Sequence, residues 1–153
     1  AEMAVDVQAL GARRDELVRL RMSAASGSKP DDAVVLAAVN LPGYYTALET
    51  ILERVARLLD EEVPEGAAWH HQLVLQMSVE VPGLRPALIP AETIRDVEEL
   101  RRFRHFFRNA YVLCFDAAKI LEHIQRVERV HPPLERSLGS FRDHVKAVAN
   151  AAG

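Results

Sequence analysis

Residues 100–111 concentrate side chains that can handle a phosphate or a proton. The segment contains four arginines, one histidine, one asparagine, three phenylalanines and a tyrosine, and it has no acid, although the whole chain carries a net charge of -3. Guanidinium groups bind phosphate oxygens through paired N–H donors, and histidine exchanges a proton near neutral pH. The segment therefore predicts a contact with a phosphodiester, or with an oxyanion that develops during a reaction.

Helical spacing sorts this segment into two neighbouring stripes, because positions three, four and seven apart lie on one side of an α-helix. The cationic stripe consists of Arg101, Arg104, Arg108 and Tyr111, with His105 at its edge. The apolar stripe consists of Leu100, Phe103, Phe107 and Cys114. Such a helix can bury the apolar stripe and still present the row of cations beside it.

Two interpretations of the cationic stripe are open. In the more ordinary one, the arginines form a solvated helix face and pair with acids of neighbouring helices. In the other, the clustered donors of Arg101, Arg104 and Arg108 bind a phosphodiester oxygen or a developing oxyanion. The phenol of Tyr111 on the same stripe and the absence of local acids favour the second interpretation.

Length and composition bound the kind of protein. At 153 residues, with 49% hydrophobic and 27% charged residues, the chain is expected to fold as one domain over residues 1–153. A pI near 6.1 excludes a protein that coats nucleic acid with its whole surface, so an RNA contact must use a local patch.

No metal or other cofactor is predicted. The single cysteine, Cys114, cannot form an internal disulfide, and no Cys/His spacing resembles a zinc site. The adjacent His70 and His71 point about a hundred degrees apart on a helix, so packing or surface roles are expected for them. The longest apolar run, residues 33–39, is too short to span a bilayer. We expect a cytoplasmic protein without a membrane contact.

The elements that position the segment are all helical. Apolar residues recur at helical period, and no period-2 strand pattern appears. The expected helices cover residues 2–25, 31–60 with a kink or split at Pro42-Gly43, 67–79, 91–113, 117–130, and a last helix that follows a break at His131-Pro132-Pro133 and ends near 148. Residues 60–66 are expected to form a solvated turn, and Asp116 to cap the fifth helix. The fold class is therefore an all-α bundle of five to six helices.

The segment of residues 104–111 resembles a motif of a known family. Arg104-His-Phe-Phe-Arg-Asn109-Ala-Tyr111 resembles the motif of HEPN-type ribonucleases, specifically the HepT-like ribonuclease toxins. Three further segments are similar to parts of that family: Tyr44-Tyr-Thr-Ala-Leu-Glu-Thr-Ile-Leu-Glu-Arg-Val, Trp69-His-His-Gln-Leu and Val81-Pro-Gly-Leu-Arg-Pro-Ala. The resemblance covers roughly residues 34–141 and implies a HEPN-like helical bundle.

The resemblance also implies an activity. In that family an arginine and a histidine from two protomers meet in a cleft at the dimer interface and cleave RNA without a metal. Arg104 matches the arginine, His105 the polar position that follows it, and Tyr111 the tyrosine, but Asn109 stands where the family has histidine. Asparagine cannot shuttle a proton near neutral pH. Three explanations stay open: His105 has taken over the acid/base role, the chain is a less active or inactive relative, or Asn109 is an engineered inactivation.

The family further implies two partners: a second copy of the chain in a homodimer, and a nucleotidyltransferase (MntA-like) antitoxin that attaches nucleotide groups to the motif tyrosine, here Tyr111. The first hypothesis is therefore a metal-independent RNA endonuclease toxin that this modification neutralises. The alternative is a non-catalytic HEPN module that binds RNA or a partner nucleotidyltransferase. A helical dimerisation adaptor is a third option.

Overall fold

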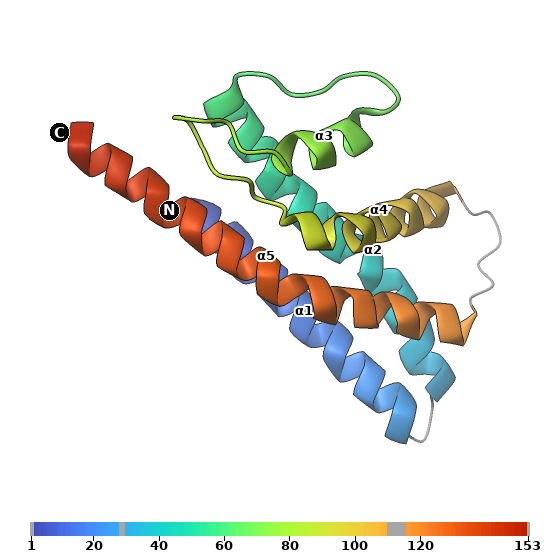
Figure 1. Ribbon diagram of the computed structural model, residues 1–153. Helices are drawn as coiled ribbons and strands as arrows, with labels where there is room; N and C mark the ends of the chain where they lie inside the picture. The colour runs from blue at the N-terminus through green and yellow to red at the C-terminus, as the bar shows by residue number, and fades with distance from the viewer. Residues whose placement is uncertain (1, 28–29, 110–115, 153) are drawn as a thin grey trace.

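The computed structural model describes residues 2–27, 30–109 and 116–152. Within these ranges the chain is a bundle of five α-helices, with a π-helical and a 3-10 turn and no strand (Figure 1). The nearest approach to a sheet is one isolated bridge between Val81 and Arg85. The prediction of an all-α bundle is confirmed.

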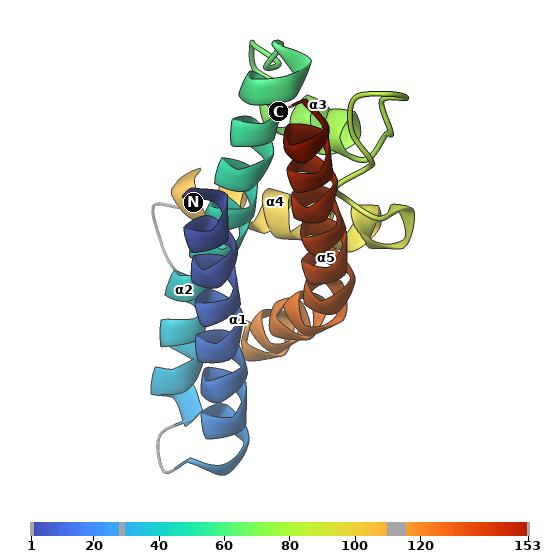
Figure 2. The same ribbon diagram turned by 90° about the vertical axis from the view of Figure 1, so that its left-hand side faces the viewer.

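Helices α1 (Glu2–Ser26) and α2 (Pro30–Val55) form a long antiparallel hairpin, which Figures 1 and 2 show from two sides. Pro30 begins α2 and acids follow in the first turn, as the sequence predicts. The sequence predicts a kink or a split at Pro42, and the split is wrong because α2 continues through this proline. Proline removes one backbone hydrogen bond, and the buried Leu41 and Tyr44 on either side pack both halves of the helix into the core.

The chain leaves α2 through a π-helical turn, Ala56–Asp60, so Asp60 is a helical residue and not part of a solvated turn. Its carboxylate accepts two hydrogen bonds of 2.7 Å from the fully buried guanidinium of Arg85. Arg85 also donates to the backbone carbonyls of Gln76 and Val79. This ion pair fixes the proline-rich connection of residues 78–90 to the end of α2, and its hydrogen bonds lower the pKa of Asp60.

Helix α3 (Trp69–Met77) is two residues shorter at each end than predicted, and it packs against α2 and α4. The chain then forms a 3-10 turn, Ala91–Thr93, which leads directly into α4 (Ile94–Asn109). The backbone N–H and the hydroxyl of Thr93 both donate to the carbonyl of Pro90. Residues 110–113, the predicted end of this helix, lie outside the described residues.

Helix α5 (Ala117–Ala152) is one continuous helix, so the predicted break at Pro132-Pro133 is wrong. Asp116 caps its start as predicted, since its carboxylate accepts a 2.9 Å hydrogen bond from the N–H of Ala118. Figure 2 shows that the second half of α5 runs in a different direction from the first half. The helix continues through the prolines because the buried His131 and Leu134 pack both of its halves against the other helices.

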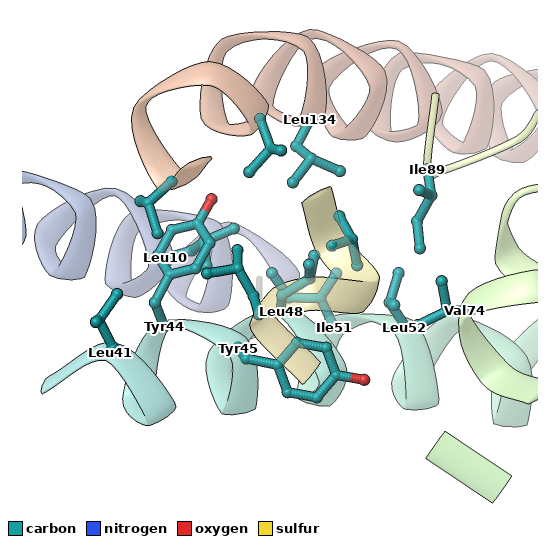
Figure 3. Close-up of a cluster of buried hydrophobic side chains, with 14 of the residues drawn as sticks. Leu10, Leu41, Tyr44, Tyr45, Leu48, Ile51, Leu52, Val74, Ile89 and Leu134 are labelled. Carbon is teal, nitrogen blue, oxygen red and sulfur yellow. The ribbon is translucent and has the colours of Figure 1, made fainter. Parts of the chain in front are cut away.

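The core lies along α2, which contacts each of the other four α-helices. Tyr44 and Tyr45 are buried in it, and Figure 3 shows their hydroxyl groups pointing in different directions. The hydroxyl of Tyr44 lies 3.1 Å from Nδ1 of His131 on α5, so His131 is a buried interhelical residue and not the turn residue that the sequence suggests. Tyr45 lies on the side of α4. The two faces of α2 therefore connect to α5 and α4 through different tyrosines.

Candidate functional site

Burial changes along α4. Its first half is packed into the bundle, where Val97 and Leu100 are buried together with the carboxylate of Glu98. Its last turn and a half is different, because His105, Phe106, Arg108 and Asn109 are all exposed. The ring of Phe106, although apolar, is 59% exposed. The candidate site residues are thus divided between a buried region and an exposed end.

Arg104 points toward α2. Its Nε donates a 2.9 Å hydrogen bond to the hydroxyl of Thr46, and its Nη2 lies 3.8 Å from a carboxylate oxygen of Glu49. The centre of the guanidinium is 6.0 Å from the centroid of the Tyr45 ring, which is within the range of a cation–π contact. Only 15% of its side chain is exposed. Arg104 is therefore held against α2, with only a small part of its side chain exposed.

Glu49 is a buried acid on an otherwise apolar face of α2, and it is 4% exposed. One of its carboxylate oxygens faces Arg104, and the other lies 2.5 Å from Nδ1 of His70 on α3. The imidazole of His70 stacks on the indole of Trp69 with 3.7 Å between ring centroids. Burial and the charge of Glu49 raise the pKa of the neighbouring Tyr45 hydroxyl, so this phenol stays neutral. The result is a chain of contacts from His70 through Glu49 to Arg104.

Arg101 also pairs with a buried carboxylate, in this case one on its own helix. Its Nε and Nη2 donate to the carboxylate of Glu98 at 3.0–3.2 Å, and Nδ1 of His71 lies 2.9 Å from the same carboxylate. Glu98 is 7% exposed. The adjacent histidines of α3 thus contact two different buried glutamates, one on α2 and one on α4. Arg104 thus faces an acid of a neighbouring helix, and Arg101 pairs with an acid of its own helix.

The exposed end of α4 has few internal contacts. The side-chain amide of Asn109 donates a 2.7 Å hydrogen bond to the backbone carbonyl of His105 and lies 3.5 Å from Nε2 of that histidine. Arg108 makes no hydrogen bond or ion pair with any residue that the structure describes. These side chains are therefore available to a molecule that arrives from solvent.

A shallow hollow of about 430 Å³ lies on this end of α4. All of its described lining comes from that helix, and consists of Arg101, Arg102, His105, Phe106 and Asn109. A second hollow of about 350 Å³ shares Arg102 and Phe106 with the first and extends to α5, where it reaches His123. Burial, together with the charge of Arg126, lowers the pKa of His123. Phe106 stands between the two hollows.

The predicted site residues therefore separate into two groups, with Tyr111 outside the described residues. His105 and Asn109 share the hollow with Arg101, and Arg108 lies on the same exposed end, whereas Arg104 faces α2. Sequence reasoning missed the two glutamates and gave the α3 histidines no role in the site. A signal for Glu49 was present, because it falls at helical spacing between Tyr45 and Leu52 on an apolar face, where an acid needs a cationic partner.

The family of the chain follows from a comparison with known protein families. The family model described as HepT-like protein matches residues 36–145. The chain belongs to the HepT-like family. The match runs from α2 into α5 and includes all of α4, and it confirms the resemblance stated from the sequence. No match was found among curated proteins or among solved structures.

Two further observations concern ligands and surroundings. Among the described residues, no group of three or more histidine, cysteine, aspartate or glutamate side chains is placed to hold a metal ion. In the same residues, no helix combines the length and the apolar character needed to cross a membrane.

Proposed function

We propose that this HepT-like protein is a toxin that cleaves RNA without a metal. The observation that carries the proposal is the exposed end of α4, where His105 and Asn109 share a hollow with arginines inside the region that matches the family. An exposed histidine beside cations suits proton transfer at a phosphodiester, because the cations stabilise negative charge on the phosphate oxygens.

Each side chain has a distinct role in this proposal. Arg104 and Arg108 bind the scissile phosphate, the first from its place against α2, where 15% of its side chain is exposed, and the second from the exposed end. His105 donates or accepts the proton. Asn109 positions His105, which its amide already contacts. Tyr111 orients the substrate, a role that rests on the family motif because this residue lies outside the described part of the chain.

A homodimer completes the site. Every described residue that lines the first hollow comes from α4, so the described part of the chain walls this hollow from one helix alone. A two-fold contact between α4 helices brings two hollows, and two copies of His105, into one cleft. One histidine then acts as the base and the other as the acid, which a phosphodiester cleavage requires.

A nucleotidyltransferase antitoxin is the proposed regulatory partner. Transfer of nucleotide groups to Tyr111 adds bulk and negative charge three residues beyond Arg108. The attached phosphate then competes with RNA for the cations of the site. Mass spectrometry after co-expression with such an enzyme tests this step: we expect adenylate mass shifts on the tryptic peptide of residues 109–119, and none in the Tyr111→Phe variant. An unmodified peptide in the presence of active enzyme would contradict it.

RNA cleavage in the presence of EDTA tests the main proposal. Wild-type protein should cleave a single-stranded RNA, and His105→Gln should lower the rate by about a hundredfold because the proton transfer is lost. His144→Gln on α5 is the control, since His144 is half-buried, lies outside both hollows, and places its Nε2 3.2 Å from the backbone carbonyl of Leu84. It should keep the wild-type rate. Equal rates for both variants would exclude His105 as the acid or base.

A non-catalytic module that binds RNA or a nucleotidyltransferase is the second candidate. The observation in its favour is Asn109, which stands at the family's histidine position and uses its amide for a hydrogen bond to the backbone of its own helix. Asn109→His separates the two candidates. If the site is catalytic, the restored histidine should increase the cleavage rate. If cleavage is absent both before and after the change while RNA binding persists, the binding module is correct.

A further inference from the structure

Helix α3 contributes nothing to the wall of the hollow, yet it contacts the site through its two adjacent histidines. His70 reaches Glu49 on α2 at 2.5 Å, and His71 reaches Glu98 on α4 at 2.9 Å. Adjacent residues on a helix point about a hundred degrees apart, so the pair can contact two different neighbours. Because α3 packs on both α2 and α4, each histidine meets the carboxylate of a different helix.

Each of these carboxylates is shared between one histidine and one arginine of the site. Glu49 presents one oxygen to His70 and the other to Arg104, while Glu98 accepts hydrogen bonds from Arg101 and contacts His71 through Oε2. Both carboxylates are buried, and a buried charge is stable only when it is paired and hydrogen-bonded. Removal of the histidine therefore lets the carboxylate move toward the arginine. This movement changes the position of the guanidinium and the degree to which its charge is neutralised.

We infer that His70 and His71 are positioning residues for the arginines of the site. His70 sets the orientation of Arg104 through Glu49, and His71 sets the orientation of Arg101 through Glu98. One consequence of the inference rests on the proposed function. It is that α3 controls how the two guanidinium groups meet an RNA phosphate. The contacts themselves do not depend on that function.

The exposure of the histidines distinguishes this role from simple packing. The side chain of His71 is 45% exposed and that of His70 is 22% exposed, so water could satisfy much of their polar character without either glutamate. Each ring nevertheless directs Nδ1 at a carboxylate. Asparagine can place an N–H donor near the position of Nδ1, whereas leucine keeps comparable bulk without any donor. The two substitutions therefore separate the hydrogen bond from the packing.

The NMR signals of the arginine Nε–H groups test the inference without any cleavage assay. The signals are assigned with Arg104→Lys and Arg101→Lys. We expect His70→Leu to shift the Arg104 signal and leave that of Arg101 in place, and His71→Leu to do the reverse. His70→Asn and His71→Asn should restore the wild-type positions, and His144→Leu should change neither signal. An Arg104 signal that His70→Leu leaves in place, or a shift that asparagine does not reverse, would overturn the inference.

Kinetics supply the second readout. His70→Leu should lower kcat by at least about tenfold while KM changes less, because a misplaced guanidinium loses its alignment with the reacting phosphate. Combining His70→Leu with Arg104→Lys should add little to the loss from Arg104→Lys alone, whereas combining it with Arg101→Lys should multiply the two losses. Multiplied losses in both pairs would overturn the inference. A wild-type protein that cleaves no RNA would refute the proposed function, while the arginine signals would still decide the positioning role.

Discussion

Arg104 and Arg108 are the same residue type, lie one turn apart on one stripe of α4, and have opposite surroundings. Arg104 donates to Thr46, faces Glu49 and is 15% exposed, while Arg108 is exposed and has no partner among the described residues. Helical spacing places both guanidinium groups on one side of the helix. Their environment is decided by α2, which covers the first of them and leaves the second in solvent.

The same contrast holds for the two regions of α4. In the buried region the charges of Arg101 and Arg104 are balanced by Glu98 and Glu49, so this part of the cationic stripe attracts an anion weakly at a distance. At the exposed end no acid of the described chain opposes Arg108. In the proposed function, the buried region orients the site and the exposed end supplies most of its attraction for RNA.

The largest expected effect comes from the buried acid. Glu49→Ala leaves the guanidinium of Arg104 against α2 without its counter-charge, and loss of one partner of a buried pair costs about 3 kcal/mol of unfolding free energy. The matched control is Glu99→Ala, which breaks an exposed pair with Arg102 and should cost less than about 1 kcal/mol. Urea denaturation measures both. Equal costs would show that the two regions do not differ.

The dependence of folding stability on pH tests the contrast between buried and exposed side chains at a histidine. Burial, with the charge of Arg14, lowers the pKa of His131, so the folded protein binds this proton less readily than the unfolded chain. The unfolded state then gains protons as the pH falls below about 6.5, and stability falls by up to about 1.4 kcal/mol per pH unit for this one group.

His131→Asn removes this titration and keeps an acceptor for the hydroxyl of Tyr44. The variant should therefore lose less stability than wild type between pH 7.5 and pH 5.5, as measured by urea denaturation at each pH. Parallel pH profiles for wild type and His131→Asn would contradict the role of burial.

The smallest expected effect is on the salt dependence of RNA binding. Arg108→Ala should leave the unfolding free energy within about 0.5 kcal/mol of wild type, because it removes an exposed side chain that has no partner among the described residues. It should reduce the slope of log affinity against log salt by about 0.7 for a single strand, the value expected for one phosphate contact. Arg104→Ala should reduce stability more and the slope less. Fluorescence anisotropy over a range of salt concentrations measures the slopes, and the reverse order would contradict the division of roles.

Local signals in the sequence predicted the helix starts well. Pro30 with its following acids, Pro90, and the capping carboxylate of Asp116 act within one turn, so their effect does not depend on the rest of the fold. Of the kink or split predicted at Pro42, the split was wrong, and so was the break predicted at Pro132-Pro133, because the outcome at those prolines depends on packing. Buried residues on both sides hold the helix together there, and a local pattern does not contain that information.

For the candidate site, too, the sequence predicted the local features and not the contacts between distant helices. Residue types and spacing located the exposed end of α4, and they placed His105 beside the arginines. They did not reveal that Arg104 faces Glu49, since the two residues lie 55 positions apart and meet only when α4 packs on α2. The histidines of α3 were missed for the same reason. Contacts between distant helices follow from tertiary packing, which no single segment specifies.

Cross-linking of RNA to the protein tests the central claim most directly, namely that RNA meets the exposed end of α4. A single-stranded RNA that carries 4-thiouridine is irradiated with the protein, and the tryptic peptides are identified by mass spectrometry. The account predicts cross-links in the peptides of residues 105–108 and 109–119, where the exposed ring of Phe106 lies in the first peptide. It also predicts that these cross-links disappear at high salt. Cross-links confined to α1 or to the second half of α5, with none in these two peptides, would contradict it.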